Sequence, residues 1–233
     1  GATPRAVAEQ CEIVMVCVGN DNDVRSVVLG PDGLLAGLKP GSILVDHTTA
    51  SATLARELSA ECAKKSVGFI DAPVSGGQAG AQNGVLTVMC GATSEVFNTI
   101  QPVAMAFSRA VTLMGDVGAG QTTKMVNQIC IAGVVQGLAE AMHFAQQAGL
   151  DGQAVLDTIS KGAAQSWQME NRGSTMLQGK YDFGFAVDWM RKDLAITLNE
   201  ARHNGATLPL TALVDQFYAQ VQAMGGGRWD TSS

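Results

Sequence analysis

The sequence predicts an α/β protein, in which a mostly parallel sheet with helices on both faces is followed by an all-α half. Two observations support this fold class. Up to about residue 115, short apolar runs rich in β-branched residues alternate with amphipathic stretches, as in sheets whose strands are joined by helices. Beyond that point, apolar residues recur only at helical spacing. We therefore expect two domains, residues 1–116 and 117–233.

The apolar runs of the first half, together with residues that favour helix starts and ends, predict its helices and strands. Thr3 and Pro4 favour a helix start, and the run 12–18 is apolar enough for a strand buried on both faces. In order, we expect a helix over 4–10, a strand over 12–18, a helix over 21–29, a turn over 30–33, a strand over 42–46, a helix over 51–64, strands over 68–73 and 85–90, and a helix over 94–107.

A single long helix is predicted over 120–149, a length of about 40 Å at 1.5 Å per residue. Gly133 and Gly137 lie four residues apart, so another helix can approach closely there. Further helices are expected over 151–160, 169–177, 187–204 and 211–224. The apolar residues taken to define the buried face of the long helix are Met125, Ile129, Val134, Leu138, Ala141 and Ala145.

Composition and charge argue against several functional classes. The net charge of −6 includes no basic block, which argues against nucleic-acid binding because phosphate neutralisation needs clustered Lys and Arg. The apolar run 13–18 is far shorter than the roughly 20 residues that cross a bilayer, so we expect no membrane association. The five cysteines and three histidines lack metal-ligand spacing, and we predict no metal site. The cysteines are interpreted as small buried side chains in the reducing cytoplasm.

The first candidate site is Ser75-Gly76-Gly77, which follows the third expected strand. Ligands of open parallel sheets bind outside the carboxyl ends of the strands. Successive glycine N–H groups can bind a carboxylate there, and the Ser75 hydroxyl adds a donor. An ordinary tight turn explains the same residues equally well.

The second candidate site begins the long helix, after Gly118 and Gly120. Glycines at this place let a ligand approach the first turn, whose unpaired N–H groups attract anions. Lys124, Asn127 and Gln128 share one helical face. A lysine there can donate a proton to a carbonyl oxygen, and Asn127 can hold its ammonium group. Taken alone, such a motif more often marks a solvated first turn.

Two other segments are weak signals when each is taken alone. The residues 46–49, Asp-His-Thr-Thr, form a polar strand end, and the Lys192–Asp193 pair within a helix is usually a solvated face. Together, however, the four segments resemble the β-hydroxyacid dehydrogenase family, which includes 3-hydroxyisobutyrate dehydrogenase and tartronate semialdehyde reductase. The matching pieces are DHTT at 46–49, DAPVSGG at 71–77 followed by GAQNGVLTVMCG, GAGQTTKMVNQ at 118–128, FAVDWMRKDL at 185–194 and GATLPLT at 205–211.

The resemblance implies an NAD- or NADP-dependent enzyme that interconverts a small β-hydroxyacid and its semialdehyde. It implies that Lys124 is the catalytic acid/base and that Asn127 orients it. The implied substrate-binding residues are Ser75, Gly76, Gly77, Gln128 and Asp193, and the implied cofactor-binding residues are Val18, Gly19, Thr49, Phe185 and Lys192. It also implies a Rossmann-type sheet domain, a helical substrate and dimerisation domain, a long helix between them, and a homodimer or homotetramer.

The chain departs from the family pattern in one respect. The family's Gly-rich pyrophosphate turn lies in its first βαβ unit, and no GxGxxG follows a strand here. We therefore expect an incomplete Rossmann-type domain in a chain cut at both ends, with weak cofactor binding. The residue that selects NAD or NADP belongs to the same absent unit, so that choice stays open.

Several alternatives stay open after the resemblance is considered. The chain could be a catalytically silent oligomeric scaffold of the same fold, although such relatives lose the lysine found at 124, or an inactive truncated fragment. Lys124 argues against the imine-reducing relatives. Candidate substrates are 3-hydroxyisobutyrate, tartronate semialdehyde, glyoxylate, succinic semialdehyde and serine-type acids.

Overall fold

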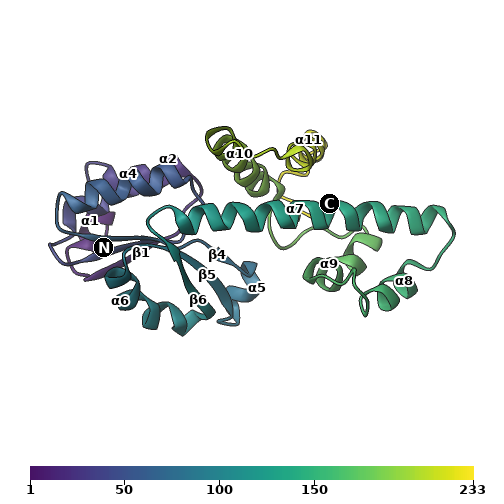
Figure 1. Cartoon of the computed structure of the whole chain (residues 1–233), viewed down its shortest axis with the longest axis horizontal. Helices are drawn as coiled ribbons and strands as arrows, with labels where there is room; N and C mark the ends of the chain where they lie inside the picture. Colours follow the sequence, from purple (N-terminus) through teal and green to yellow (C-terminus); the bar gives the residue numbers. More distant parts are fainter. The chain divides into compact units, whose positions relative to one another are not determined.

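The computed structural model describes all 233 residues and confirms the expected fold class, a Rossmann-like α/β part followed by a helical part (Figure 1). The chain divides into two compact units, Gly1–Met125 and Val126–Ser233. The assignment of residues 1–116 to cofactor binding and 117–233 to substrate binding and dimerisation stays a prediction.

The first unit contains a six-stranded sheet. Its elements are α1 (Pro4–Ala8), β1 (Ile13–Val16), α2 (Asp21–Leu29), α3 (Leu34–Gly37), β2 (Ile43–Asp46), α4 (Ala52–Ala63), β3 (Gly68–Asp71), β4 (Val74–Ser75), α5 (Gly77–Gln82), β5 (Leu86–Gly91), α6 (Ser94–Ala104), the 3-10 turn η1 (Met105–Phe107) and β6 (Ser108–Gly115).

The sheet order is β1-β2-β3-β5-β4, with β6 paired to β5. β1, β2 and β3 are mutually parallel, and their register places Asp46 opposite Asp71 at the strand ends. β5 runs antiparallel to β3 and parallel to β6. The carboxyl ends of the three parallel strands therefore form one edge, on which ligands of such sheets bind.

Helices cover both faces of the sheet, with α2 and α4 on one face and α6 on the other (Figure 1). Successive strand residues point to opposite faces. Leu44 and Phe69 accordingly pack in the cluster with α2 and α4, whereas Val45 and Ile70 pack in the cluster with α6. This two-sided burial explains why the strands are continuous apolar runs rather than alternating ones.

Four elements were not predicted: α3, β4, α5 and β6. β6 has no continuous apolar run, because its burial is irregular along the strand. The helix expected over 94–107 ends earlier, at Ala104, and continues as the turn η1. Pro102 lies inside this helix, where it lacks the N–H group that would bond to the carbonyl four residues earlier.

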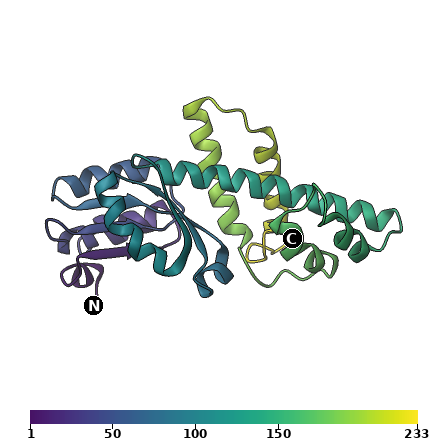
Figure 2. The ribbon, with the colours of Figure 1, turned by 60° about the horizontal axis from the view of Figure 1, so that its bottom comes forward.

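The helices of the second half occur where they were expected. They are α7 (Ala119–Gln147), α8 (Gly152–Ile159), α9 (Trp167–Leu177), α10 (Val187–Asn204) and α11 (Pro209–Ala223). α10 ends at Gly205, whose left-handed φ of 80° closes the last turn. α10 and α11 pack together through Met190, Leu194 and Val214, and Figure 2 shows the loop that joins them.

The buried face of α7 is partly different from the predicted one. Val134 and Ala141 are exposed and Ile129 is half-buried, because the buried residues lie at neighbouring positions of the helical repeat. The buried apolar side chains of α7 are Met125, Ala132, Val135, Leu138, Met142 and Ala145. By length and apolar composition alone α7 could cross a membrane, two properties that the core helices of soluble proteins share.

The glycine pair of α7 is used at one of its two positions. A Cβ atom built at Gly133 would lie 3.1 Å from the Leu210 side chain of α11, whereas one at Gly137 would meet nothing within 4 Å. The close helix approach predicted for this pair therefore occurs at Gly133 alone.

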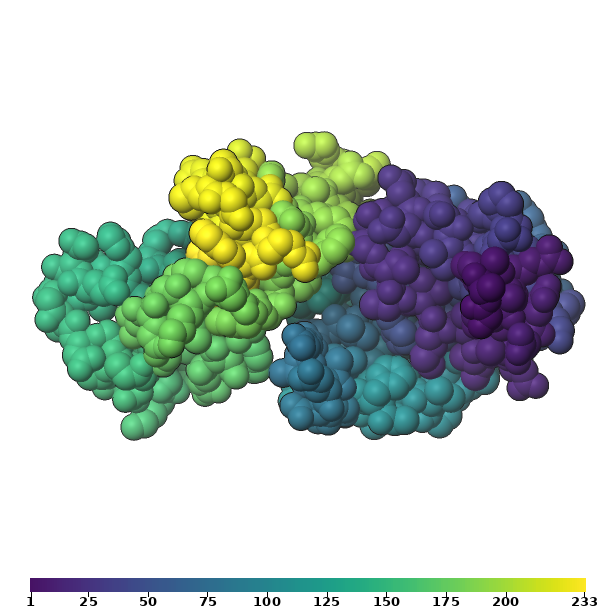
Figure 3. Space-filling model, turned by 180° about the vertical axis from the view of Figure 1, so that it is seen from behind, coloured from purple at the N-terminus to yellow at the C-terminus, as the bar shows by residue number.

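The last residues of the chain pack within the second unit. Asp230 accepts a hydrogen bond from Arg172 Nε at 3.0 Å and forms a β-bridge with Ala186. Figure 3 shows this yellow C-terminal segment beside the green residues of α9. The Arg172 guanidinium also lies 5.0 Å from the Trp167 ring and 4.9 Å from the Phe183 ring.

The five cysteines form no disulfide, and only Cys62 and Cys90 are buried as predicted. Cys17 and Cys130 are exposed and Cys11 is half-buried, so the expectation of five buried side chains was wrong for these three. Burial raises the pKa of both Cys62 and Cys90 to about 12, which leaves their thiols protonated and unreactive at neutral pH.

Candidate active site

The carboxyl ends of β1, β2 and β3 bring together several predicted site residues. Val18 and Gly19 follow β1, Thr49 follows β2, and Ser75 follows β3 as part of β4. The Val18 amide donates to Thr48 Oγ1 at 3.0 Å, which ties the ends of β1 and β2 to each other. The three residues predicted to contact the cofactor in this unit thus lie on adjacent strand ends.

A buried carboxyl group shapes the turn after β2. Asp46 Oδ1 accepts a hydrogen bond from the Thr48 amide at 2.9 Å. Burial raises the pKa of Asp46 to about 6, since removal from water disfavours the ionised form. His47 Nδ1 lies 2.7 Å from Ala72 O and therefore carries a proton, which it donates to that carbonyl. Burial lowers the His47 pKa, which favours the neutral ring.

The raised pKa of Asp46 has a consequence for stability. The folded-state pKa of about 6 exceeds the ordinary value of 3.8, so stability is lost as pH rises toward and through 6. We expect Asp46→Asn, which cannot ionise, to lack this loss. Between pH 5 and pH 8 the native chain should lose about 1 kcal/mol more unfolding free energy than the variant. Urea unfolding of both chains at the two pH values measures this difference. An equal loss of unfolding free energy in the native chain and the variant would contradict it.

Asp71 joins the end of β3 to the first turn of α7. Its Oδ1 accepts from the Gly118 amide at 2.7 Å and its Oδ2 accepts from the Gln121 amide at 2.8 Å. The carboxyl group is fully buried, and burial raises its pKa against the opposing effect of these amides. The N–H groups expected to attract a ligand anion are therefore bound by the chain's own carboxylate, and that part of the prediction was wrong.

Gly118 and Gly120, at the start of α7, allow this docking. Gly118 has a φ of 96°, in the left-handed region that favours glycine. A Cβ atom at Gly120 would collide with the backbone oxygens of Met89 and Asp71. Gly120 thus lets the helix start pack directly on the strand residues Met89 and Asp71.

Gln121 is a site residue that the sequence reasoning missed. Its side chain is 1% exposed, its Nε2 donates to Thr48 O at 2.7 Å, and its Oε1 accepts from the Ala50 amide at 3.1 Å. In the sequence, only its place between the glycines and Lys124 could have indicated this role. The role assigned to that motif depended on Lys124 rather than on Gln121.

Lys124 lies three residues after Gln121 on α7 and is buried. The first turn of this helix is held by the Asp71 carboxylate and by the Gln121 side chain. The helix geometry therefore fixes the backbone of Lys124 relative to the ends of β2 and β3.

The Ser75-Gly76-Gly77 segment is a strand end and a helix start, rather than only a turn. Ser75 pairs with Thr87 of β5, and Gly76 and Gly77, the N-cap and first residue of α5, have φ values of 133° and 62°. Both glycines are exposed, and a Cβ atom at Gly77 would meet nothing within 4 Å. A small group can therefore approach this backbone.

Four predicted residues of the second unit form one polar network. Gln128 Nε2 donates to Asp193 Oδ2 at 2.6 Å, and Gln128 Oε1 accepts from Asn127 Nδ2 at 2.8 Å. Lys192 Nζ lies 3.1 Å from Asp193 Oδ1. Asn127 thus has Gln128 as a side-chain partner, and the prediction that Asn127 orients Lys124 stays a prediction.

Phe185 packs against the core cluster that contains Val187 and Met190. Its amide donates to Asp230 Oδ2 at 2.9 Å, so the C-terminal segment holds its backbone. The prediction that Phe185 and Lys192 cover the cofactor stays a prediction.

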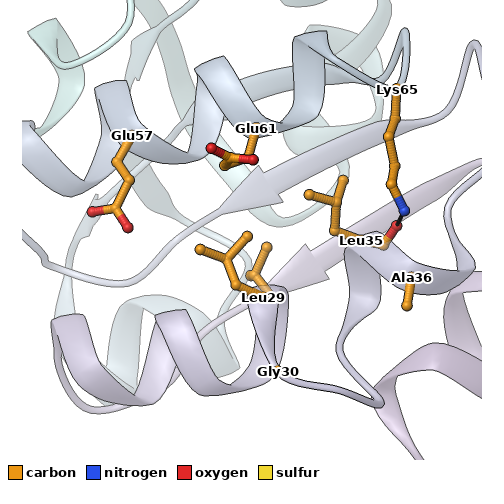
Figure 4. Close-up of a pocket in the computed structure, with 8 residues that line it drawn as sticks. Leu29, Gly30, Leu35, Ala36, Glu57, Glu61 and Lys65 are labelled. Atoms are coloured by element: carbon orange, nitrogen blue, oxygen red, sulfur yellow. Dashed lines mark hydrogen bonds between the residues drawn. The ribbon is translucent and has the colours of Figure 1, made fainter.

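A shallow hollow on the first unit lies apart from these residues, beside α2, α3 and α4 (Figure 4). The Lys65 ammonium group there donates to Leu35 O at 2.8 Å, and Glu57 is paired with Arg25 at 2.8 Å. Its charged groups are thus bound to the chain itself, and we assign the hollow no chemistry. The lining residues are Val28, Leu29, Gly30, Leu35, Ala36, Glu57, Glu61 and Lys65.

The strand ends fit one half of a dinucleotide better than the other. Gly19 and the uncharged Thr49 offer a small residue and a hydroxyl on neighbouring strands, which suits a nicotinamide ring. The following helix α2 does not suit a pyrophosphate. Asn20 already accepts from its first amides at 2.8 and 3.1 Å, and Asp21 and Asp23 add negative charge.

Comparison with known proteins adds independent information. Residues 1–115 match the family described as the NAD binding domain of 6-phosphogluconate dehydrogenase. Residues 118–233 match the family described as NAD-binding of NADP-dependent 3-hydroxyisobutyrate dehydrogenase. An uncharacterized oxidoreductase of Shewanella frigidimarina is 65% identical to this chain, over 99% of this chain and 79% of its own length.

Two solved structures are similar over nearly the whole chain. The 3-hydroxyisobutyrate dehydrogenase of Salmonella typhimurium is 33% identical with a TM-score of 0.89, covering 99% of this chain and 81% of that one. The 3-hydroxyisobutyrate dehydrogenase of Mycobacterium tuberculosis, solved with L-serine, is 27% identical with a TM-score of 0.87, covering 98% and 80%.

Proposed function

This chain belongs to the β-hydroxyacid dehydrogenase family, and we propose that it interconverts a small β-hydroxyacid and its semialdehyde with Lys124 as general acid/base. The cofactor is NAD or NADP. The observation that carries the proposal is the anchoring of Lys124, one turn after a helix start bound to the same strand ends that carry Thr49 and Ser75. A silent scaffold would not need a buried lysine at this place.

The chemistry divides between the cofactor and the chain's own residues. When bound, the nicotinamide supplies or accepts the hydride at the substrate carbon. Lys124 gives a proton to the carbonyl oxygen during reduction and takes it from the hydroxyl during oxidation. The exposed backbone of Gly76 and Gly77, with the Ser75 hydroxyl, binds the substrate carboxylate.

The remaining predicted residues support this chemistry. Thr49, Val18 and Gly19 border the nicotinamide, on the strand ends where ligands of parallel sheets bind. The network of Asn127, Gln128, Asp193 and Lys192 orients the substrate and covers the cofactor, together with Phe185.

The substrate class is a short acid with a carboxylate and a hydroxyl near one another. The mycobacterial relative, solved with L-serine, supports this class because serine carries both groups. Among the candidates, 3-hydroxyisobutyrate, tartronate semialdehyde, glyoxylate and succinic semialdehyde differ in the carbon chain beyond the carboxylate.

The test is a substrate panel with reduced cofactor. Purified protein, both as this chain and in a longer form that includes the family's Gly-rich turn, is mixed with each aldehyde acid and with NADH or NADPH. We expect the loss of reduced-nicotinamide absorbance with at least one aldehyde acid and none with its uncharged aldehyde analogue. Equal rates with the two analogues would contradict carboxylate recognition by the Ser75 segment, and no turnover by either form would contradict the activity.

We also propose that the protein is a homodimer or homotetramer in the cytoplasm, a location supported by five cysteines without a disulfide. One face of α7 exposes large apolar side chains, with Val126 57%, Val134 40% and Phe144 72% exposed. Exposed apolar side chains that gather on a surface are typical of an association site, and a second copy of the chain offers the same residues for self-complementary packing.

Association through this α7 face predicts the effect of a charge placed on it. Val134→Asp should shift the protein to the monomer, because burial of an unpaired carboxylate opposes association. Gln146→Asp, on the opposite side of the same helix and also exposed, should leave the mass unchanged. Light scattering at matched concentrations measures both variants. An unchanged oligomer in Val134→Asp would exclude this face.

A further inference from the structure

We propose that Gln121 is a positioning residue that holds Thr49 and Lys124 in register for the reaction. The inference rests on the proposed function, in which Thr49 borders the nicotinamide and Lys124 transfers the proton. It assigns a role to a side chain that is only 1% exposed, and it follows from four hydrogen bonds at the ends of β2 and β3.

The Gln121 side chain binds the backbone on both sides of Thr49. Its Nε2 donates to Thr48 O at 2.7 Å, and its Oε1 accepts from the Ala50 amide at 3.1 Å. A primary amide has one donor side and one acceptor side, so it satisfies both peptide groups at once. The backbone of Thr49 is thereby fixed from two directions.

The backbone of Gln121 is fixed as well. Its amide donates to Asp71 Oδ2 at 2.8 Å, next to the bond from the Gly118 amide to Asp71 Oδ1. The first turn of α7 is therefore attached to the end of β3 by Asp71. The side chain of Gln121 then attaches the same turn to the end of β2.

The lysine follows on the same face of the helix. Residues three apart in an α-helix are neighbours on its surface, so Gln121 and Lys124 lie one above the other. If the turn at Thr49 moved relative to the helix start, the position of Thr49 relative to Lys124 would change. A hydride donor and a proton donor must reach opposite atoms of one carbonyl group, so such a shift lowers the rate.

The roles of Asp71 and Gln121 can be separated. The carboxylate of Asp71 binds backbone amides of the helix start, whereas the side chain of Gln121 binds the turn that contains Thr49. Removing the Gln121 amide therefore leaves the helix docked on β3 and releases the turn. A residue that only supported folding would change stability without changing the kinetic constants of the folded fraction.

The experiment replaces Gln121 by methionine, which has a similar size and lacks both hydrogen-bonding groups. Gln136→Met is the matched control, since Gln136 lies on the same helix and binds the exposed Glu140. In Gln121→Met we expect the KM for the cofactor to rise about tenfold and kcat to fall about tenfold, from the loss of two buried hydrogen bonds. The KM for the hydroxy acid should stay within about twofold, because the Ser75 segment makes no contact with Gln121 among these bonds.

Folding and function are separated by measurements made in parallel. Thermal unfolding establishes the folded fraction of each variant, and Gln121→Leu, which also lacks both hydrogen-bonding groups, replaces the methionine variant where that does not fold. Native-like cofactor KM and kcat in a folded Gln121 variant would overturn the positioning role. Lys124→Ala measured in the same assay tests the proposed function separately. Loss of turnover there, with an unaffected Gln121 variant, contradicts the inference alone, whereas normal turnover in Lys124→Ala contradicts the proposed function itself.

Discussion

Replacement of Lys124 by alanine is expected to lower kcat by about two to four orders of magnitude, the range that a positioned general acid contributes. The Lys124 side chain is buried on a helix start fixed by Asp71 and Gln121, so a proton donor from the solvent does not easily take its place. The KM for the hydroxy acid should change less, by about threefold or below, because the carboxylate is bound by the Ser75 segment. Steady-state oxidation of the hydroxy acid measures both constants.

Lys180→Ala is the control for this result, because Lys180 is an exposed lysine of the second unit. It should leave both constants unchanged. A Lys124→Ala variant that retains more than about a tenth of native kcat would contradict the assignment of the general acid, since removal of such a group costs at least about a hundredfold.

The largest effect on stability is expected at Asp71. Asp71→Ala leaves the amides of Gly118 and Gln121 buried without an acceptor, at about 1–3 kcal/mol for each group. We expect the unfolding free energy to fall by about 3 kcal/mol, which is a large fraction of the stability of an ordinary domain. Urea unfolding followed by circular dichroism measures it.

The pH dependence of the Asp71 effect has a defined sign. Burial raises the pKa of Asp71 above its ordinary value, so the native chain loses stability as pH rises through the folded-state pKa. The difference between native and Asp71→Ala should therefore be smaller at high pH than at low pH. Asp182→Ala, at an exposed aspartate, should have no measurable effect. Equal stability of native and Asp71→Ala would contradict the role of this carboxylate in docking α7.

Elements with local start and stop signals could be predicted from the sequence. The helix α2 matches its expected bounds, and the Asn20 side chain caps its first amides. The helix α10 also matches, and Gly205 adopts the left-handed conformation that ends it. The strands β4 and β6 could not be predicted because their stability depends on pairing with β5. The pattern of residues within each strand does not reveal that pairing.

Only those residues of the candidate site that belong to recognisable sequence motifs could be assigned a role from the sequence. The strand ends and Lys124 follow from local pattern and resemblance. The roles of Asp71 and Gln121 could not, because each depends on contact between segments about 50 to 70 residues apart. The glycines at 118 and 120 were attributed to ligand approach for the same reason. Gly118 lies against Ala52 and Arg56 of α4, and Gly120 against Asp71 at the end of β3, neighbours that only the folded chain brings there.

A nicotinamide-dependent dehydrogenase of small hydroxy acids must bind NAD or NADP, so cofactor binding is the measurement that decides the proposed function. NADH and NADPH are titrated separately, following protein fluorescence, into this chain and into a variant extended at its N-terminus by a βαβ unit with a Gly-rich turn. We expect saturable binding of one of the two cofactors by the extended variant, with a Kd on the order of micromolar. If neither NADH nor NADPH binds saturably to either protein, the result would contradict the dehydrogenase function.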